Sequence, residues 1–123
     1  MTKNPDIDPV EERARLARTA LEELKAQDVR EIDVRRLTPI ADTMLICTGT
    51  SNRHVRALAR AVIDKLRAHG VRPRGIEGLT EGEWVLVDLD SVIVHVMQAQ
   101  TRAFYQLEKL WDLPAISDAA HAQ

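Results

Sequence analysis

Residues 84–97 read WVLVDLDSVIVHVM and contain two valine-rich runs, 84–89 and 92–97, separated only by Asp90-Ser91. Runs of this length and composition are typical of β-strands, and a two-residue connection between them predicts a tight hairpin. Strands joined in this way are antiparallel. A sheet that contains residues 84–97 therefore cannot be wholly parallel.

Upstream of the hairpin, residues 43–70 predict a strand followed by the clearest helix in the sequence. Residues 43–47 (TMLIC) form a short apolar run of the kind found in buried strands. Thr50 or Ser51 can cap the start of the helix, and Gly70 can end it. Apolar residues occupy the helical spacing i, i+3, i+4, i+7 and i+11, namely Val55, Leu58, Ala59, Val62 and Leu66.

The remaining segments extend this pattern toward both ends of the chain. We expect a first helix that begins at Asp8-Pro9, a half-buried strand over residues 29–37, a short edge segment over 72–78 and a last helix that ends before Pro114. The apolar stripe of the first helix is Val10, Ala14, Ala17, Leu21 and Leu24, and that of the last is Ala103, Phe104, Leu107, Leu110 and Trp111.

Helices alternate with strands in this order while a hairpin is present, which predicts an α/β fold. The sheet is mixed, has about five strands and carries flanking helices. We expect one domain over residues 9–113, between flexible tails at 1–8 and 114–123.

The composition excludes several classes of protein. The chain has 123 residues, 45% of them hydrophobic and 29% charged, and a net charge of −2, which argues against a protein that holds nucleic acid chiefly through phosphates. Cys47 is the single cysteine, and His54, His69, His95 and His121 lack the spacing of a metal site, so no disulfide, metal or cofactor is expected. No signal peptide or membrane-spanning run is apparent, and the expected location is the cytoplasm.

Charge is unevenly distributed along the chain. Residues 51–75 carry seven basic residues against the single acid Asp64, whereas residues 76–90 carry five acids and no base. These segments are either two solvated surfaces of opposite sign or, for the acidic one, a surface that faces a basic partner. The sequence leaves both interpretations open.

The turn Thr48-Gly49-Thr50-Ser51 is the most enzyme-like feature, because a glycine turn before a helix can hold a phosphate. A nucleotide-binding or nucleotidyl-transferring enzyme would also need paired carboxylates for magnesium, and the candidates are Asp88 and Asp90. They follow almost forty residues later, on the far side of another strand. The alternative, which we favour, is that Gly49 makes the turn and Thr50 or Ser51 caps the helix.

The hairpin has one aliphatic face and one mixed face. Alternation places Trp84, Leu86 and Asp88 together on the first strand, and Ile93, His95 and Met97 together on the second. A carboxylate sealed in a core is costly unless it is paired, so we expect the mixed face to be at least partly open. An aromatic anchor beside apolar residues and a carboxylate is typical of a protein-binding surface. The alternative is that a helix covers this face.

Several linked motifs resemble the ribosomal silencing factor (Iojap-like) family over about residues 10–112. They are Ala41-Asp42, residues 46–55 (ICTGTSNRHV), residues 83–88 (EWVLVD), residues 92–97 (VIVHVM), Arg102, Tyr105 and residues 107–111 (LEKLW). The resemblance implies a domain shaped like nucleotidyltransferases but without their catalytic motif, and hence no enzyme.

The resemblance also implies a partner and a mechanism. Members of this family bind protein L-fourteen on the large ribosomal subunit, where they obstruct joining of the small subunit and repress translation when nutrients are limiting. They form homodimers when free, and ribosomal RNA is at most a secondary contact. For this chain we expect Trp84 to anchor the contact, Asp88, Asp42 and His95 to add polar contacts, and Met97 and Tyr105 to add soft surface. A purely structural role in assembling the large subunit is a third hypothesis.

Overall fold

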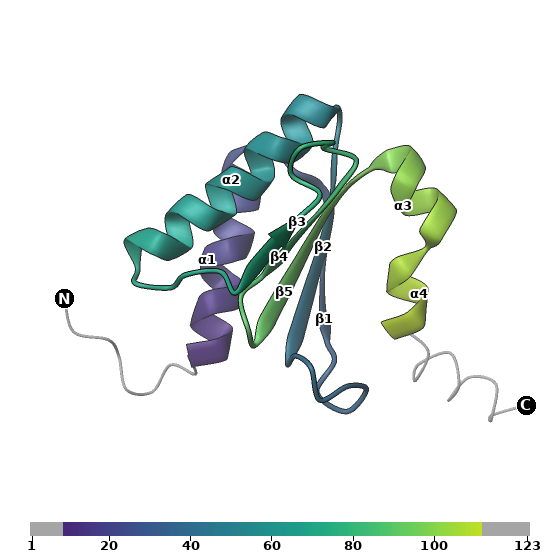
Figure 1. The fold of residues 1–123 in the computed structure, drawn as a ribbon. Coiled ribbons are helices and arrows are strands. Elements are labelled where there is room, and N and C mark those ends of the chain that lie inside the picture. Colours follow the sequence, from purple (N-terminus) through teal and green to yellow (C-terminus); the bar gives the residue numbers. More distant parts are fainter. Residues whose placement is uncertain (1–8, 112–123) are drawn as a thin grey trace, which may run out of the picture.

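A five-stranded sheet forms the centre of the computed structural model, which describes residues 9–111 (Figure 1). The strands are β1 (Gln27–Asp33), β2 (Thr43–Gly49), β3 (Gly75–Glu77), β4 (Trp84–Asp88) and β5 (Val92–Gln98). They lie in the order β1-β2-β5-β4-β3, and β2 with β5 is the parallel pair. The other three pairs are antiparallel, so the predicted mixed sheet is confirmed.

The β4–β5 hairpin has the predicted connection. The backbone N–H of Leu89 donates to the carbonyl of Val92 over 2.8 Å, which closes the turn around Asp90 and Ser91. Asp90 has a φ of 74°, in the left-handed region that Asp tolerates better than most residues because its short side chain bonds locally. The Asp88 carboxylate supplies such a bond by accepting the Asp90 N–H over 2.8 Å.

Two helices, α1 (Pro9–Glu23) and α2 (Asn52–Ala68), cover one face of the sheet (Figure 1). The predicted stripe of α2 is confirmed, because all five of its residues are buried. Ser51 is the N-cap and accepts the His54 N–H over 3.0 Å, while Gly70, at φ +81°, follows the C-cap His69. The core on this face joins both helices to the inward residues of the strands: Leu45, Cys47, Val85, Val87, Val92, Val94 and Val96.

Two predicted boundaries differ from the structure. Leu24 lies beyond the end of α1 and is 42% exposed, because the chain turns at Lys25, which has a φ of 63°. The first strand spans Gln27–Asp33 rather than 29–37, because the backbone turns after Val34, whose carbonyl accepts the Leu37 N–H. Val34 and Ile32 are both buried, as their alternation predicted.

The single last helix was a wrong prediction. The chain forms α3 (Ala99–Tyr105) and α4 (Leu107–Trp111), separated by Gln106 at a φ of 50°. Two residues of the expected apolar stripe do not pack into a core, since Phe104 is 78% exposed and Leu110 is 59% exposed. We call residues 99–111 the C-terminal arm; it lies on the face of the sheet opposite α1 and α2 (Figure 1).

The N-cap predicted at Asp8, the stop at Pro114 and both predicted tails lie outside the described residues. Within residues 9–111, no helix has the length and apolar character needed to cross a membrane.

Candidate functional site

The mixed face predicted from the hairpin is one continuous surface in the structure. Residues directly opposite each other in paired strands share a face. The pairs that make up this face on β4 and β5 are Trp84 with Met97, Leu86 with His95, and Asp88 with Ile93. The face continues onto β2 through Met44, Ile46 and Thr48. It is half-open, because the β4 residues are partly exposed whereas those on β5 are buried.

Trp84 is held in place by its neighbour His95. The indole Nε1–H donates to Nδ1 of His95 over 2.9 Å, and the ring centroids are 5.9 Å apart. Burial lowers the pKa of His95 from 6.5 to about 4, so the ring is neutral at physiological pH. A neutral ring with Nδ1 as acceptor carries its proton on Nε2, and this tautomer keeps the indole bond intact.

Trp84 also begins a row of three aromatic rings that reaches the C-terminal arm. The Trp84 and Tyr105 ring centroids are 5.0 Å apart at an interplanar angle of 49°, and Tyr105 meets Phe104 edge to face at 4.9 Å. Tyr105 is 55% exposed and Phe104 is 78% exposed. We call Trp84, Phe104 and Tyr105 the aromatic cluster. It places large apolar surface in solvent, which is informative in a chain with so few aromatic residues.

The predicted acidic residues lie at the opposite end of the same face. Asp88 and Trp84 are four residues apart on β4, about 13 Å at 3.3 Å per residue. Asp42 precedes β2, and its N–H donates to the carbonyl of Ser91 over 2.8 Å, which places it beside the hairpin turn. Both aspartates are half-buried. The structure therefore separates the aromatic and acidic parts of the predicted site.

The burial of two predicted site residues limits what they can contact. Met97 is fully buried and His95 is 5% exposed, so the prediction that Met97 adds soft surface is wrong for this structure. The reason is that β5 is the central strand of the sheet, and Met97 belongs to a second hydrophobic cluster, against which Trp84, Leu86 and Leu107 pack. The buried members of this second hydrophobic cluster are Ile32, Val34, Ala41, Met44, Ile46, Ile93 and Met97. His95 acts on the surface only through its bond to Trp84.

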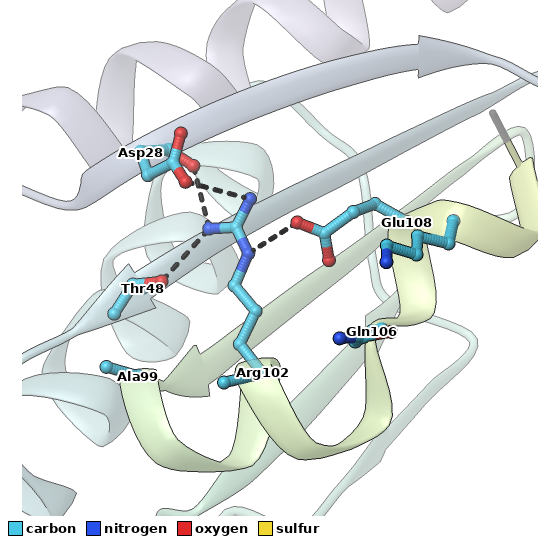
Figure 2. Close-up of a pocket in the computed structure, with 8 residues that line it drawn as sticks. Asp28, Thr48, Ala99, Arg102, Gln106 and Glu108 are labelled. Atoms are coloured by element: carbon cyan, nitrogen blue, oxygen red, sulfur yellow. Dashed lines mark hydrogen bonds and ion pairs between the residues drawn. The ribbon is translucent and has the colours of Figure 1, made fainter.

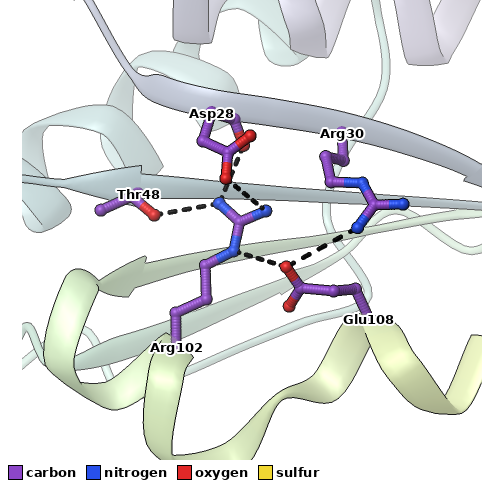
Figure 3. Close-up of polar contacts among 5 residues, drawn as sticks. All are labelled: Asp28, Arg30, Thr48, Arg102 and Glu108. Carbon is purple, nitrogen blue, oxygen red and sulfur yellow. Dashed lines mark hydrogen bonds and ion pairs between the residues drawn. The ribbon is translucent and has the colours of Figure 1, made fainter.

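Arg102 is the residue of this region to which the sequence assigned no role. Its guanidinium is buried, with 7% of the side chain exposed, and donates from Nη1 to the Thr48 hydroxyl over 2.9 Å and to the Asp28 carbonyl over 2.8 Å (Figure 2). Nε donates to Oε2 of Glu108 over 2.9 Å (Figure 3). One side chain thus ties α3 to β1, β2 and α4. Only its place in the family motif marked Arg102 in the sequence.

The Arg102 contacts border a hollow of about 310 Å³ between the arm and the ends of β1 and β2 (Figure 2). Its lining is mainly polar or charged: Asp28, Thr48, Ala99, Arg102, Ala103, Gln106, Glu108 and Lys109. Arg102 and the two carboxylates pair with one another, at 2.9 Å for Glu108 and 3.5 Å for Asp28. The hollow is a consequence of how the arm is fastened.

The geometry argues against the nucleotide hypothesis built on Gly49. Gly49 pairs with Gln98 at one end of the sheet, whereas Asp88 pairs with Ile93, five residues away along β5 and about 16 Å distant. Asp90 is engaged by Arg74, whose Nη1 lies 2.6 Å from its carboxylate. The turn and the carboxylates therefore cannot hold one nucleotide together.

Gly49 has a packing role instead. A Cβ at this position would lie 2.7 Å from Cγ2 of Val55 on α2, so glycine is what allows β2 to approach the helix. Ser51 caps α2, and the Thr50 N–H donates to Nδ1 of His54 over 2.9 Å. These contacts match the interpretation that the turn is structural.

Cys47 is buried in the core beneath α2, and burial raises the pKa of its thiol to about 12, with Arg102 acting weakly in the opposite direction. A thiol that stays protonated is a poor nucleophile and metal ligand. Within residues 9–111, no cluster of three or more His, Cys, Asp or Glu side chains could hold a metal ion.

Comparisons with known proteins agree with the motifs. Residues 7–123 match the family described as ribosomal silencing factor during starvation. A ribosomal silencing factor of Chromobacterium violaceum is 46% identical over 102 residues, 83% of this chain and 84% of that protein. The mouse protein named mitochondrial assembly of ribosomal large subunit protein 1 is 33% identical over 101 residues, 77% of this chain and 44% of that protein. A crystal structure of a C. violaceum protein superposes with a TM-score of 0.83 at 45% identity, covering 85% of this chain and 87% of that one. By these matches, the chain belongs to the ribosomal silencing factor family.

Proposed function

We propose that this chain binds the large ribosomal subunit through protein L-fourteen in the cytoplasm and, while bound, keeps the small subunit from joining it. Translation is then repressed in proportion to occupancy when nutrients are limiting. The family match supports a ribosomal role. The name of the mouse relative refers to the large ribosomal subunit, which favours that subunit as the partner.

The observation that carries the proposal is the exposed aromatic cluster. Tyr105 and Phe104 are more than half exposed, and Trp84 is half-buried against Tyr105 and His95. Interface hot spots are enriched in Trp and Tyr, and a side chain already held in its bound orientation loses less freedom on binding. Trp84 is held in this way, because the bond to His95 and the tilted ring contact with Tyr105 restrain its ring. We assign Trp84 as the anchor and Tyr105 as its extension.

Charge supports a basic partner. Glu77, Glu81 and Glu83 are exposed, and Asp88 and Asp42 are half-exposed. Asp88 lies on the same face of β4 as Trp84. Complementary potential accelerates encounter and fixes orientation. In this proposal Asp88 and Asp42 make the polar contacts with the partner. His95 orients Trp84 through their hydrogen bond, and Met97, which is paired with Trp84 on β5, supports it from the core.

The mechanism needs no chemical step. A folded domain in a chain of 13.8 kDa, placed on a joining surface, excludes the other subunit by overlap. An interface of the standard size, about 800 Å² per partner, suffices when a few anchors are well packed. We therefore propose a non-enzymatic repressor without a cofactor. We also propose a homodimer in the free state, which light scattering of the purified chain tests.

Co-sedimentation with isolated large subunits tests the docking. Wild-type protein should migrate with the subunit, and Trp84→Ala should weaken binding by more than about 2 kcal/mol, as for a hot spot. Leu24→Ala is a matched control, because Leu24 is apolar and 42% exposed at the end of α1, on the other layer. Wild-type protein that remains at the top of the gradient contradicts the proposal.

Two further measurements separate the parts of the mechanism. Purified protein L-fourteen, titrated with the chain in a calorimeter, should bind wild type and lose affinity for Trp84→Ala. Small subunits added to preloaded large subunits should join more slowly in proportion to occupancy. Unchanged joining at full occupancy would favour the assembly hypothesis instead, which predicts accumulated subunit precursors in cells that lack the chain.

A further inference from the structure

The C-terminal arm has the reverse of the usual helix polarity. A surface helix normally buries its apolar side and exposes its charged side. In α3, all of whose residues are described, Arg102 is the only buried residue, whereas Phe104 and Tyr105 point largely into solvent. On α4, Leu110 is 59% exposed. The arm therefore presents apolar surface outward and is fastened by a charged side chain.

The intrinsic stability of α3 is not enough to hold the arm in place. With seven residues, α3 is far below the roughly 12–15 residues at which an isolated helix becomes even marginally stable in water. Its position depends on contacts with the sheet, and among the arm residues whose side chains are described, Leu107 packs partly buried against the second hydrophobic cluster. The other deep contact is Arg102.

The geometry of the Arg102 contacts constrains both the place and the rotation of α3. The planar guanidinium presents its donors in a fixed fork, so bonds to Thr48, Asp28 and Glu108 together allow one orientation (Figure 3). Tyr105 follows Arg102 by three residues and is therefore its neighbour on the helix surface. An anchored Arg102 brings the Tyr105 ring to 5.0 Å from Trp84.

The anchor contributes more to position than to stability. Burying a guanidinium and a carboxylate carries a desolvation cost, which their attraction roughly offsets. Glu108 Oε1 is buried without a hydrogen-bond partner within the described residues, and Arg102 Nη2 makes no hydrogen bond there but lies 3.5 Å from the Asp28 carboxylate, so the polar atoms of the anchor are incompletely satisfied, which is unfavourable. The net gain in stability is accordingly small, while the directional constraint remains.

We infer that Arg102 is a positioning residue for ribosome docking: it anchors the arm to β1 and β2 so that Tyr105 lies on Trp84 and completes the aromatic cluster. This inference rests on the proposed function for its biological meaning. The positioning itself, Arg102 acting on Tyr105, is a property of the free chain and is measurable without ribosomes.

The variants follow from the contacts. Arg102→Met keeps a long side chain and removes every donor, Arg102→Lys keeps the charge without the fork, and Thr48→Val removes one acceptor with almost no change of shape. Val62→Ala is the control, because Val62 is fully buried on α2 against the opposite face and its loss lowers stability without touching the arm.

The first measurement is the NMR spectrum of the free protein. The Trp84 ring current displaces the Tyr105 ring protons in wild type, and these shifts should collapse toward random-coil values in Arg102→Met. Amide exchange across residues 99–111 should rise in the same variant. Thr48→Val should move both observables partway, and Val62→Ala should leave the Tyr105 shifts unchanged. Unchanged Tyr105 shifts in folded Arg102→Met would overturn the inference.

The second measurement is a double-mutant cycle on binding to large subunits. Arg102→Met should lower the affinity about tenfold or more, the loss expected when a hot-spot contact is misplaced. Arg102→Lys should recover part of it. In a Tyr105→Ala background the same Arg102→Met change should cost little more, because two residues that act through one contact are not additive.

The two measurements distinguish the possible failures. Additive losses in the cycle would show that Arg102 does not act through Tyr105, which contradicts the inference even if docking is real. Wild-type protein that does not bind large subunits contradicts the proposed function, whereas the Tyr105 shifts still decide the positioning. If Arg102→Met does not fold, Thr48→Val carries the test, with Tyr105 shifts moved partway toward random-coil values in support and unchanged shifts against.

Discussion

The indole of Trp84 donates a hydrogen bond to Nδ1 of His95, a diagonal neighbour on the paired strand, over 2.9 Å. This hydrogen bond links a core residue to a residue of the surface. His95 is almost completely buried, whereas Trp84 is partly exposed and carries the aromatic cluster. A change in the histidine is therefore transmitted directly to the proposed docking anchor.

Acid should destabilise the fold through His95. The folded pKa, about 4, lies below the unfolded value of 6.5, so the unfolded state binds the extra proton between them. The stability contributed by the neutral ring is complete above about pH 6.5 and is lost as the pH falls from there toward 4. The loss is at most about 3 kcal/mol, because one pKa unit is worth about 1.4 kcal/mol. Urea unfolding at pH 7 and pH 4.5 measures it.

The control for this prediction is His95→Gln, whose carbonyl oxygen can accept the Trp84 N–H without titrating. Its free energy of unfolding should fall less between pH 7 and pH 4.5 than that of wild type. Equal slopes for the two proteins would contradict a role for His95 in the acid sensitivity.

Removing the charge of Asp88 should weaken docking without unfolding the chain. Asp88→Asn keeps an oxygen to accept the Asp90 N–H, a bond of 2.8 Å in the structure. For a basic partner, affinity at low salt should fall roughly two- to fivefold, as for partly exposed ion pairs, and its salt dependence should become shallower. Binding to large subunits at two salt concentrations tests this. Asp64→Asn on the exposed side of α2 is the charge-matched control, and an equal effect there contradicts a specific contact.

Gly49→Ala and Gly75→Ala should differ sharply. The first places a Cβ 2.7 Å from Cγ2 and 3.1 Å from the backbone nitrogen of Val55, so α2 must shift away from β2. Overpacking of this kind typically costs about 1–3 kcal/mol. At Gly75 no atom lies within 4 Å of the added Cβ. Thermal unfolding of both variants tests the pair, and similar losses would contradict the close approach at Gly49.

Cys47 should be unreactive in the folded protein. Its thiol is buried, with a pKa of about 12, so almost none of it is thiolate at pH 8. A disulfide-exchange reagent should label it fully in denaturant and only at the rate of unfolding in buffer. Rapid labelling of the native chain would show that the β2–α2 packing opens far more often than this core implies.

The predicted elements succeed where the signal is local. The stripe of α2 and the valine runs of the hairpin are periodic and long enough to specify their own structure, and the mixed sheet follows from the hairpin. The prediction of a single last helix was wrong because apolar residues at helical spacing, such as Phe104 and Leu110, are exposed on the surface instead of packing in a core. Gln106 interrupts it in a left-handed conformation that periodicity does not report.

The candidate site was predicted only in part. Alternation correctly placed Trp84, Leu86 and Asp88 on one half-open face. It could not show that the residues of this face on β5 are buried whereas those on β4 are partly exposed. Met97 is buried because β5 is the central strand and the second hydrophobic cluster forms around it, and the alternation of one strand does not report strand order.

The local sequence by itself determined which residues form α2 and the hairpin, because helix and strand periods are set by neighbours within a few positions. Only the tertiary structure decided that Tyr105 lies on Trp84 and that Arg102 reaches Thr48, 54 residues away. Those contacts depend on where the arm crosses the sheet. The Arg102 guanidinium with its partners on separate strands and the packing of Leu107 hold the arm there, and no local pattern contains these constraints.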